Sequence, residues 1–164
     1  MRFAVVRSRF NAPITSALLD GAMRGFADAK IERDLVETFE VPGAFELPLA
    51  ARWLAETKKY NAVVCLGCVI RGQTPHFEYV AREAAHGIAD VALRTGIPVI
   101  FGVLTTDTFE QALARAEAGA GRAAGHGGDE AHPADEERLK RSNKGYEAAL
   151  SAVDMAQLRK KFDI

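Results

Sequence analysis

Hydrogen-bonding side chains and a histidine share one short segment, residues 71–76 (Arg-Gly-Gln-Thr-Pro-His), directly after a long apolar run. Imidazole exchanges protons near neutral pH, so His76 is a candidate acid/base group. The simpler interpretation is a solvated histidine beside a helix start, which is the commoner role of a lone histidine. Residue type alone leaves both interpretations open.

Three further side chains could serve chemistry, and each has a simpler structural role. Phe10 follows the first apolar run and could stack on a ligand or act as a hydrophobic staple on its helix. Glu46 follows a Pro-Gly step, where a helix macrodipole already favours a carboxylate. Arg115 could bind an anion, or it could pair with Glu110 or Glu117 on the surface. Position alone does not decide between these roles.

Apolar periodicity predicts the elements that hold these residues. Continuous apolar runs predict strands at 3–6, 35–41, 62–70 and 98–104, and helical spacing is found at 14–26, about 45–57, 77–91, 112–116 and 146–156. Strands that alternate with helices form βαβ units with a parallel sheet and right-handed crossovers. The fold class predicted is α/β, a flavodoxin-like three-layer sandwich with a four-stranded parallel sheet flanked by helices.

The candidate residues fall after strands of this sheet. Ligands of open parallel sheets bind beyond the carboxyl ends of the strands, which selects the loops 8–11, 41–46, 69–76 and 104–108. Helix starts are marked in the same loops. Asn11 is expected to cap the first helix, Pro13 and Pro48 suit first turns, and residues 106–108 (Thr-Asp-Thr) offer caps for the fourth helix.

Composition places the chain among ordinary globular proteins. Its 164 residues, taken as one domain, are 48% hydrophobic and 26% charged with a net charge of -1, so neither nucleic acid nor a membrane surface is an expected partner. No stretch is long enough to span a membrane, and the chain starts on a strand rather than a signal peptide, so a cytoplasmic location is expected. Cys65 and Cys68 would point to opposite faces of a strand, which argues against a disulfide or a shared metal.

The pattern is interrupted between residues 119 and 142, where an exposed insertion with a helical turn at 134–141 is expected. Its Gly-rich part, 119–128, lacks the Gly-Lys-Ser/Thr ending of a phosphate-binding P-loop. His126 and His132 lie there without a cysteine partner, so no metal site is predicted.

Five ordered blocks together resemble the lumazine synthase family. They are residues 8–11 (Ser-Arg-Phe-Asn), 41–48 (Val-Pro-Gly-Ala-Phe-Glu-Leu-Pro), 67–79 around Ile-Arg-Gly-Gln-Thr-Pro-His-Phe, 101–108 (Phe-Gly-Val-Leu-Thr-Thr-Asp-Thr) and 143–149 (Asn-Lys-Gly-Tyr-Glu-Ala-Ala). The block around 70–77 is highly specific, and the resemblance covers the whole chain apart from the insertion.

The family condenses 5-amino-6-(D-ribitylamino)uracil with 3,4-dihydroxy-2-butanone 4-phosphate and releases phosphate and water, in the penultimate step of riboflavin biosynthesis. It uses no metal or organic cofactor. The resemblance implies that His76 is the acid/base group and Phe10 stacks on the pyrimidine. It also implies the remaining substrate contacts: backbone at Ala44, Phe45, Cys68, Val69 and Ile70, ribityl hydroxyls at Glu46, phosphate at Gln73 and Thr74, and Phe101 and Arg115 from a neighbouring subunit.

The 119–142 joint departs from the family pattern. It is roughly twenty residues longer than usual and lacks a basic residue found there, so Arg122, Lys140 or Lys144 is expected to complete the phosphate site beside Arg115. The family forms homo-oligomers, and a charged insertion at this joint favours an isolated pentamer over an icosahedral shell of sixty subunits. Riboflavin synthase is a further partner that the resemblance suggests.

Two other functions compete with the synthase. A non-catalytic flavin- or lumazine-binding protein on the same scaffold would not need to retain both His76 and Arg115, and both are present. A flavodoxin-like electron carrier would need a Ser/Thr-rich phosphate loop after the first strand, where residues 7–11 read Arg-Ser-Arg-Phe-Asn. The sequence therefore favours the synthase.

Overall fold

The computed structural model describes residues 1–117 and 143–162 of the chain. The expected insertion at 119–142 and its turn at 134–141 lie outside the described residues. The described elements, in chain order, are β1 (Phe3–Ser8), α1 (Ala12–Asp28), the 3-10 turn η1 (Arg33–Leu35), β2 (Val36–Val41), the 3-10 turn η2 (Ala44–Glu46), α2 (Leu47–Glu56), β3 (Ala62–Ile70), α3 (His76–Thr95), β4 (Val99–Thr106), α4 (Phe109–Ala116) and α6 (Lys144–Lys161).

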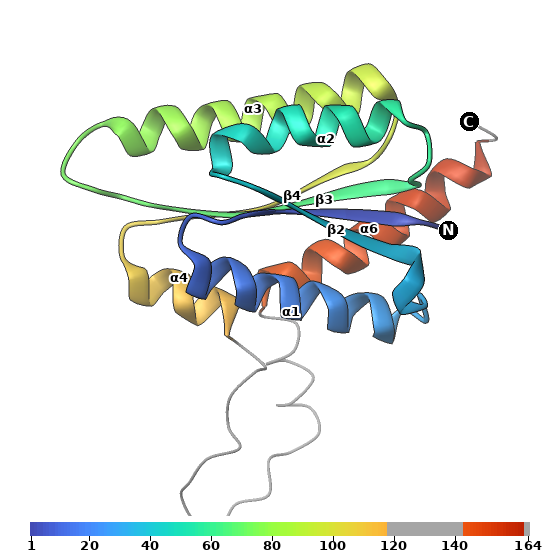
Figure 1. Cartoon of the computed structure of the whole chain (residues 1–164), viewed down its shortest axis with the longest axis horizontal. Coiled ribbons are helices and arrows are strands. Elements are labelled where there is room, and N and C mark those ends of the chain that lie inside the picture. The colour runs from blue at the N-terminus through green and yellow to red at the C-terminus, as the bar shows by residue number, and fades with distance from the viewer. Residues whose placement is uncertain (118–142, 163–164) are drawn as a thin grey trace, which may run out of the picture.

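The four described strands form one parallel sheet in the order β2-β1-β3-β4. Helices α2 and α3 cover one face, and α1, α4 and α6 cover the other (Figure 1). The predicted α/β sandwich is therefore confirmed. Within residues 1–117 and 143–162, no helix combines the length and apolar character needed to cross a membrane.

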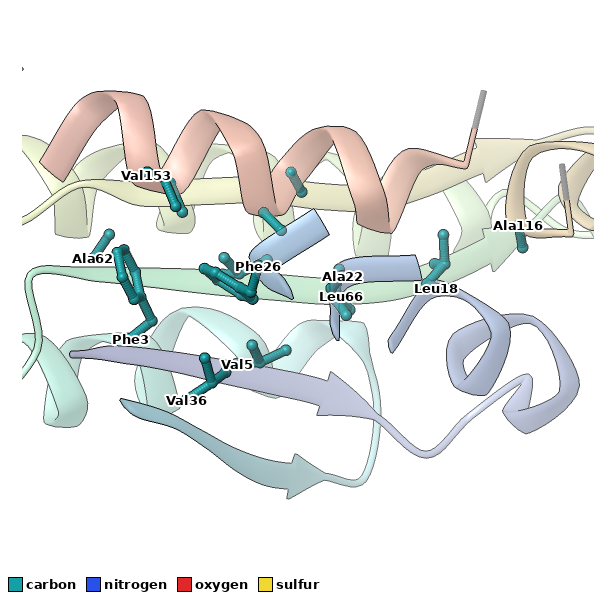
Figure 2. Close-up of a cluster of buried hydrophobic side chains, with 14 of the residues drawn as sticks. Phe3, Val5, Leu18, Ala22, Phe26, Val36, Ala62, Leu66, Ala116 and Val153 are labelled. Atoms are coloured by element: carbon teal, nitrogen blue, oxygen red, sulfur yellow. The ribbon is translucent and has the colours of Figure 1, made fainter. Parts of the chain in front are cut away.

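Burial on both faces explains why β3 reads as a continuous apolar run. Its side chains alternate between the two layers of helices: Val64 and Leu66 enter the core beneath α1 and α6, whereas Val63 and Cys65 enter the core beneath α2 and α3. In the first of these cores, the ring centroids of Phe3 and Phe26 lie 4.9 Å apart, so the two rings pack against each other (Figure 2). Both cores exclude water, so the sheet is a rigid base for its loops.

The boundaries differ from the predicted ones where polar residues continue the ladder. β1 extends to Ser8, because Arg7 pairs in register with Glu40 and its guanidinium binds Glu40 and Ser16. β4 extends to Thr106, which lies opposite Ile70. The apolar pattern stops before Ser8 and Thr106, but the backbone pairing of the sheet continues to both residues.

Asn143 connects three helices on the α6 side of the sheet. Its side chain is fully buried, and its Nδ2 donates to the carbonyl oxygens of Ala17 in α1 and Ala116 at the end of α4. Its Oδ1 accepts from the backbone N–H of Tyr146, which caps α6. A Cβ at Gly21 would lie 1.9 Å from Asn143 Oδ1, so glycine is required there while Asn143 keeps this position.

Asn143→Ala should lower the free energy of unfolding by roughly 2–4 kcal/mol, because the helix cap is lost and buried carbonyl oxygens are left without a donor. Urea denaturation followed by circular dichroism measures the loss. Asn61→Ala is the matched control, because its side chain accepts one hydrogen bond, from the Arg2 N–H, at an exposed position. Equal losses in the two variants would contradict the role given to Asn143.

Candidate functional site

Backbone hydrogen bonds join the segments at the carboxyl ends of the four strands in two pairs. The N–H of Arg9 donates to the carbonyl oxygen of Val41 at 2.8 Å, and that of Phe10 donates to Pro42 at 3.1 Å. On the other side of the sheet, the N–H of Arg71 donates to Thr106 at 2.9 Å. The strand ends therefore form two linked pairs along the carboxyl edge rather than four independent loops.

Asn11 fixes the first of these loops, though not as predicted. It occupies the N-cap position of α1 in the left-handed region (φ 56), and its side chain makes no cap hydrogen bond. Its Nδ2 donates instead to the carbonyl oxygen of Cys68 in β3, at 2.9 Å. Asparagine tolerates this backbone conformation, and the long-range bond replaces the local one. The predicted side-chain cap is therefore wrong, whereas Pro13 does lie in the first turn.

Phe10, the residue before Asn11, keeps its ring in solvent. The side chain is 69% exposed, which is far more than a hydrophobic staple against α1 would leave. The structure therefore favours the alternative, in which the ring is free to stack on a ligand.

The second loop brings a carboxylate to the same edge. Ala44 is buried, whereas Phe45 is 57% exposed and Glu46 is also exposed. A Cβ at Gly43 would lie 3.1 Å from Glu46 Oε2, so the carboxylate lies back over the glycine. η2 holds these three residues before α2 begins at Leu47, two residues later than the predicted helix start. Pro48 lies in the first turn of α2, as predicted.

The third loop presents the most polar groups. Gln73, Thr74 and His76 are all exposed, and His76 is the first residue of α3. Pro75 occupies the N-cap position, so His76 does not cap the helix. Its imidazole is therefore exposed at the carboxyl edge of the sheet, where it is available for proton transfer.

The end of β3 contributes backbone rather than side chains. Cys68 and Val69 are buried and Ile70 is half-buried. Cys68 and Cys65 are free thiols on opposite faces of β3, as predicted. Burial raises the pKa of Cys65 to about 12 and that of Cys68 to about 11, so both stay protonated near neutral pH and neither is a nucleophile.

Phe101 and Arg115 line a hollow that none of the predicted residues in the loops after β1, β2 and β3 lines. Phe101 of β4 lies opposite Cys65 of β3, whereas the last pair before the carboxyl edge of the sheet is Thr106 and Ile70. The intervening strand spans roughly 16 Å. Phe101 and Arg115 line instead a hollow of about 310 Å³ beside the outer strand β4. Lys144, Glu147 and Ser151 of α6 also line this hollow.

Two cations face this hollow. Arg115 is exposed, donates from Nη1 to the Gln111 carbonyl oxygen at 2.9 Å, and forms no ion pair with Glu110 or Glu117 in the described chain. Lys144 Nζ lies 2.7 Å from Glu147 Oε2. Arg122 and Lys140, the other candidates for the phosphate, lie outside the described residues. Glu147 was not predicted, although its i, i+3 spacing from Lys144 is that of a helical ion pair.

The donor set favours organic substrates over a metal. Across residues 1–117 and 143–162, no group of three or more His, Cys, Asp or Glu side chains is placed to hold a metal ion. His126 and His132 lie outside that part of the chain. An exposed aromatic ring, a carboxylate, amide and hydroxyl donors and an imidazole can bind a planar ring, a polyol and an anion, and can move protons among them.

Comparison with known proteins agrees with this chemistry. The model of the 6,7-dimethyl-8-ribityllumazine synthase family matches residues 1–160. A 6,7-dimethyl-8-ribityllumazine synthase of Syntrophus aciditrophicus (strain SB) is 46% identical over 158 residues, which cover 96% of this chain and 89% of the relative. The chain therefore belongs to the 6,7-dimethyl-8-ribityllumazine synthase family.

Proposed function

We propose that the chain condenses 5-amino-6-(D-ribitylamino)uracil with 3,4-dihydroxy-2-butanone 4-phosphate to 6,7-dimethyl-8-ribityllumazine at the carboxyl edge of its sheet. The family membership supports the reaction, and the exposed groups at the edge support the place. Phe10 stacks on the pyrimidine, and Glu46 binds ribityl hydroxyls. The ring edge is read by backbone groups of Ala44, Phe45, Cys68, Val69 and Ile70.

His76 carries the proton transfers in this proposal. Formation of the Schiff base, elimination of phosphate and closure of the second ring each move protons, and imidazole exchanges them near neutral pH. Gln73 and Thr74 bind the phosphate through neutral donors, and no organic cofactor is needed. Much of the acceleration comes from holding the two substrates together, since orientation alone supplies roughly 7–11 kcal/mol.

The observation that carries the proposal is that Phe101 and Arg115 line a hollow beside β4 that His76 does not line. All three belong to family blocks, yet the first two line the hollow beside β4. β4 is an outermost strand of the sheet, and the hollow lies beside it. A complete site therefore forms where the β4 side of one subunit meets the carboxyl edge of the next. Lys144 joins Arg115 at the phosphate, because both line the same hollow.

The alternative, a protein that binds flavin or lumazine without turnover, has no observation in its favour. A binding protein would use Phe10 and Glu46, but it would not need the exposed imidazole of His76. The two functions are separated by mixing purified protein with both substrates and following lumazine fluorescence over many turnovers. Binding without product formation would support the carrier.

His76→Ala should lower kcat on the order of 10²- to 10⁴-fold, the usual contribution of a general acid/base group, while the melting temperature stays unchanged. Steady-state kinetics and a thermal melt measure both. His86→Ala is the control, because His86 is an exposed histidine farther along α3. If His76→Ala turns over at the wild-type rate, His76 has no part in the mechanism.

Arg115→Ala should raise KM for the phosphorylated butanone far more than KM for the pyrimidine, because it removes a phosphate ligand. A mixed oligomer tests whether this ligand crosses between subunits. Subunits carrying His76→Ala are unfolded and refolded together with subunits carrying Arg115→Ala. Random mixing leaves about a quarter of the interfaces with both native side chains, so activity returns. If mixing restores nothing, Arg115 acts within its own chain.

We propose further that the chain forms one domain that assembles as an isolated pentamer in the cytoplasm rather than as a closed shell. The long charged joint between α4 and α6 supports the open form, because charged groups are costly to bury between neighbours. Cysteines that face opposite sides of β3 and cannot pair agree with a reducing compartment. Contact with riboflavin synthase, which would consume the product, is part of the same proposal.

Negative-stain images of the purified protein should show small five-fold rings. The same preparation, measured by light scattering at several protein concentrations, gives the mass of the particle. Closed spherical particles would contradict the open pentamer, and an active monomer would contradict a site shared between subunits.

A further inference from the structure

Arg71 links two neighbouring loops of the carboxyl edge. Its Nε lies 2.8 Å from Asp107 Oδ1, and its Nη1 lies 3.3 Å from Glu78 Oε1. Its guanidinium carbon lies 4.6 Å from the centre of the Phe77 ring. One side chain thus reaches both the loop after β4 and the first turn of α3.

These contacts close residues 72–76 into a clamped loop. Arg71 stands at the start of the loop, where its N–H continues the ladder to Thr106. Phe77 and Glu78 stand at its end, so the guanidinium bridges the two ends directly. We propose that Arg71 is a positioning residue that holds the 72–76 loop in its substrate-binding conformation without itself touching substrate. The inference rests on the proposed function, since it concerns Gln73, Thr74 and His76 as placed there.

The contact geometry requires arginine rather than a generic cation. A planar guanidinium can stack on an aromatic ring and donate in two directions at once, whereas a lysine ammonium is a compact point charge. Asp107 and Glu78 accept from two of the five N–H donors of Arg71 and offset its positive charge, which weakens its attraction for a phosphate. The substrate phosphate is therefore left to Gln73, Thr74 and the neighbouring subunit.

The clamp contributes little to global stability, which makes its role testable. Arg71, Glu78 and Asp107 have 48%, 57% and 67% of their side chains exposed, and such ion pairs add little to the free energy of folding. A change at Arg71 should therefore alter the loop and leave the fold intact.

The experiment measures kcat, both KM values and the melting temperature of Arg71→Met, Arg71→Lys and Asp107→Asn. Each variant should raise KM for the phosphorylated substrate on the order of tenfold or more, because a loop displaced by about 1 Å loses aligned donors. KM for the pyrimidine and the melting temperature should change little. Arg94→Met is the matched control, because Arg94 forms an exposed pair with Asp90 near the far end of α3.

Asp107→Asn separates positioning from simple charge. Removing a carboxylate near an anionic substrate would improve binding if charge alone mattered, whereas a positioning role predicts impairment. Equal or better phosphate binding in Asp107→Asn would overturn the proposal, and so would wild-type kinetics in Arg71→Met or Arg71→Lys. If Arg71→Met does not fold, Asp107→Asn, which retains Arg71, carries the test. A wild-type chain that makes no lumazine would instead reject the proposed function.

Discussion

The parallel pairing of β1 and β3 at the centre of the sheet is the interaction on which the site depends. Both strands are buried on both faces, so their register is set by two independent cores and cannot slip without exposing one of them. With the register set, the loops after β1 and β3 end beside one another, and the Asn11 side chain can reach the Cys68 carbonyl. Phe10 and the 72–76 loop are thereby held at one edge of the sheet.

This arrangement separates stability from chemistry. Large apolar side chains fill the two cores. The side chains proposed to bind substrate in the loops after β1, β2 and β3 are exposed at the carboxyl edge, here called the rim. Rim residues are therefore constrained through backbone hydrogen bonds and neighbours such as Asn11 and Arg71. Substrate binding can place polar groups at the rim without opening the apolar layers beneath it.

Much of the fold could be predicted from the sequence, because strands covered on both faces and helices with one apolar stripe leave strong periodic signals. The loops after these strands lie at the carboxyl edge for the same reason. The predicted strand ends were wrong where polar residues continue a strand. Thr106 extends β4 through backbone hydrogen bonds, which hydropathy does not report. Asn11 was assigned a local cap because local rules cannot show a carbonyl oxygen 57 positions away.

The site was predictable only as a set of motifs. Which residues meet in space depends on long-range geometry, which places Phe101 and Arg115 at a hollow that His76 does not line. The partners of Arg71, likewise, are recognised only when the loops after β3 and β4 are seen together.

The bond between Asn143 and Ala116 has a consequence for how the chain can vary. It ties the last residue of α4 directly to the residue before α6, so a hydrogen bond holds these two helix ends together. The entropy of closing a flexible loop grows only logarithmically with its length. Length can therefore be gained or lost at this joint during evolution, or a foreign peptide inserted by design, while the positions of Arg115 and Lys144 are preserved.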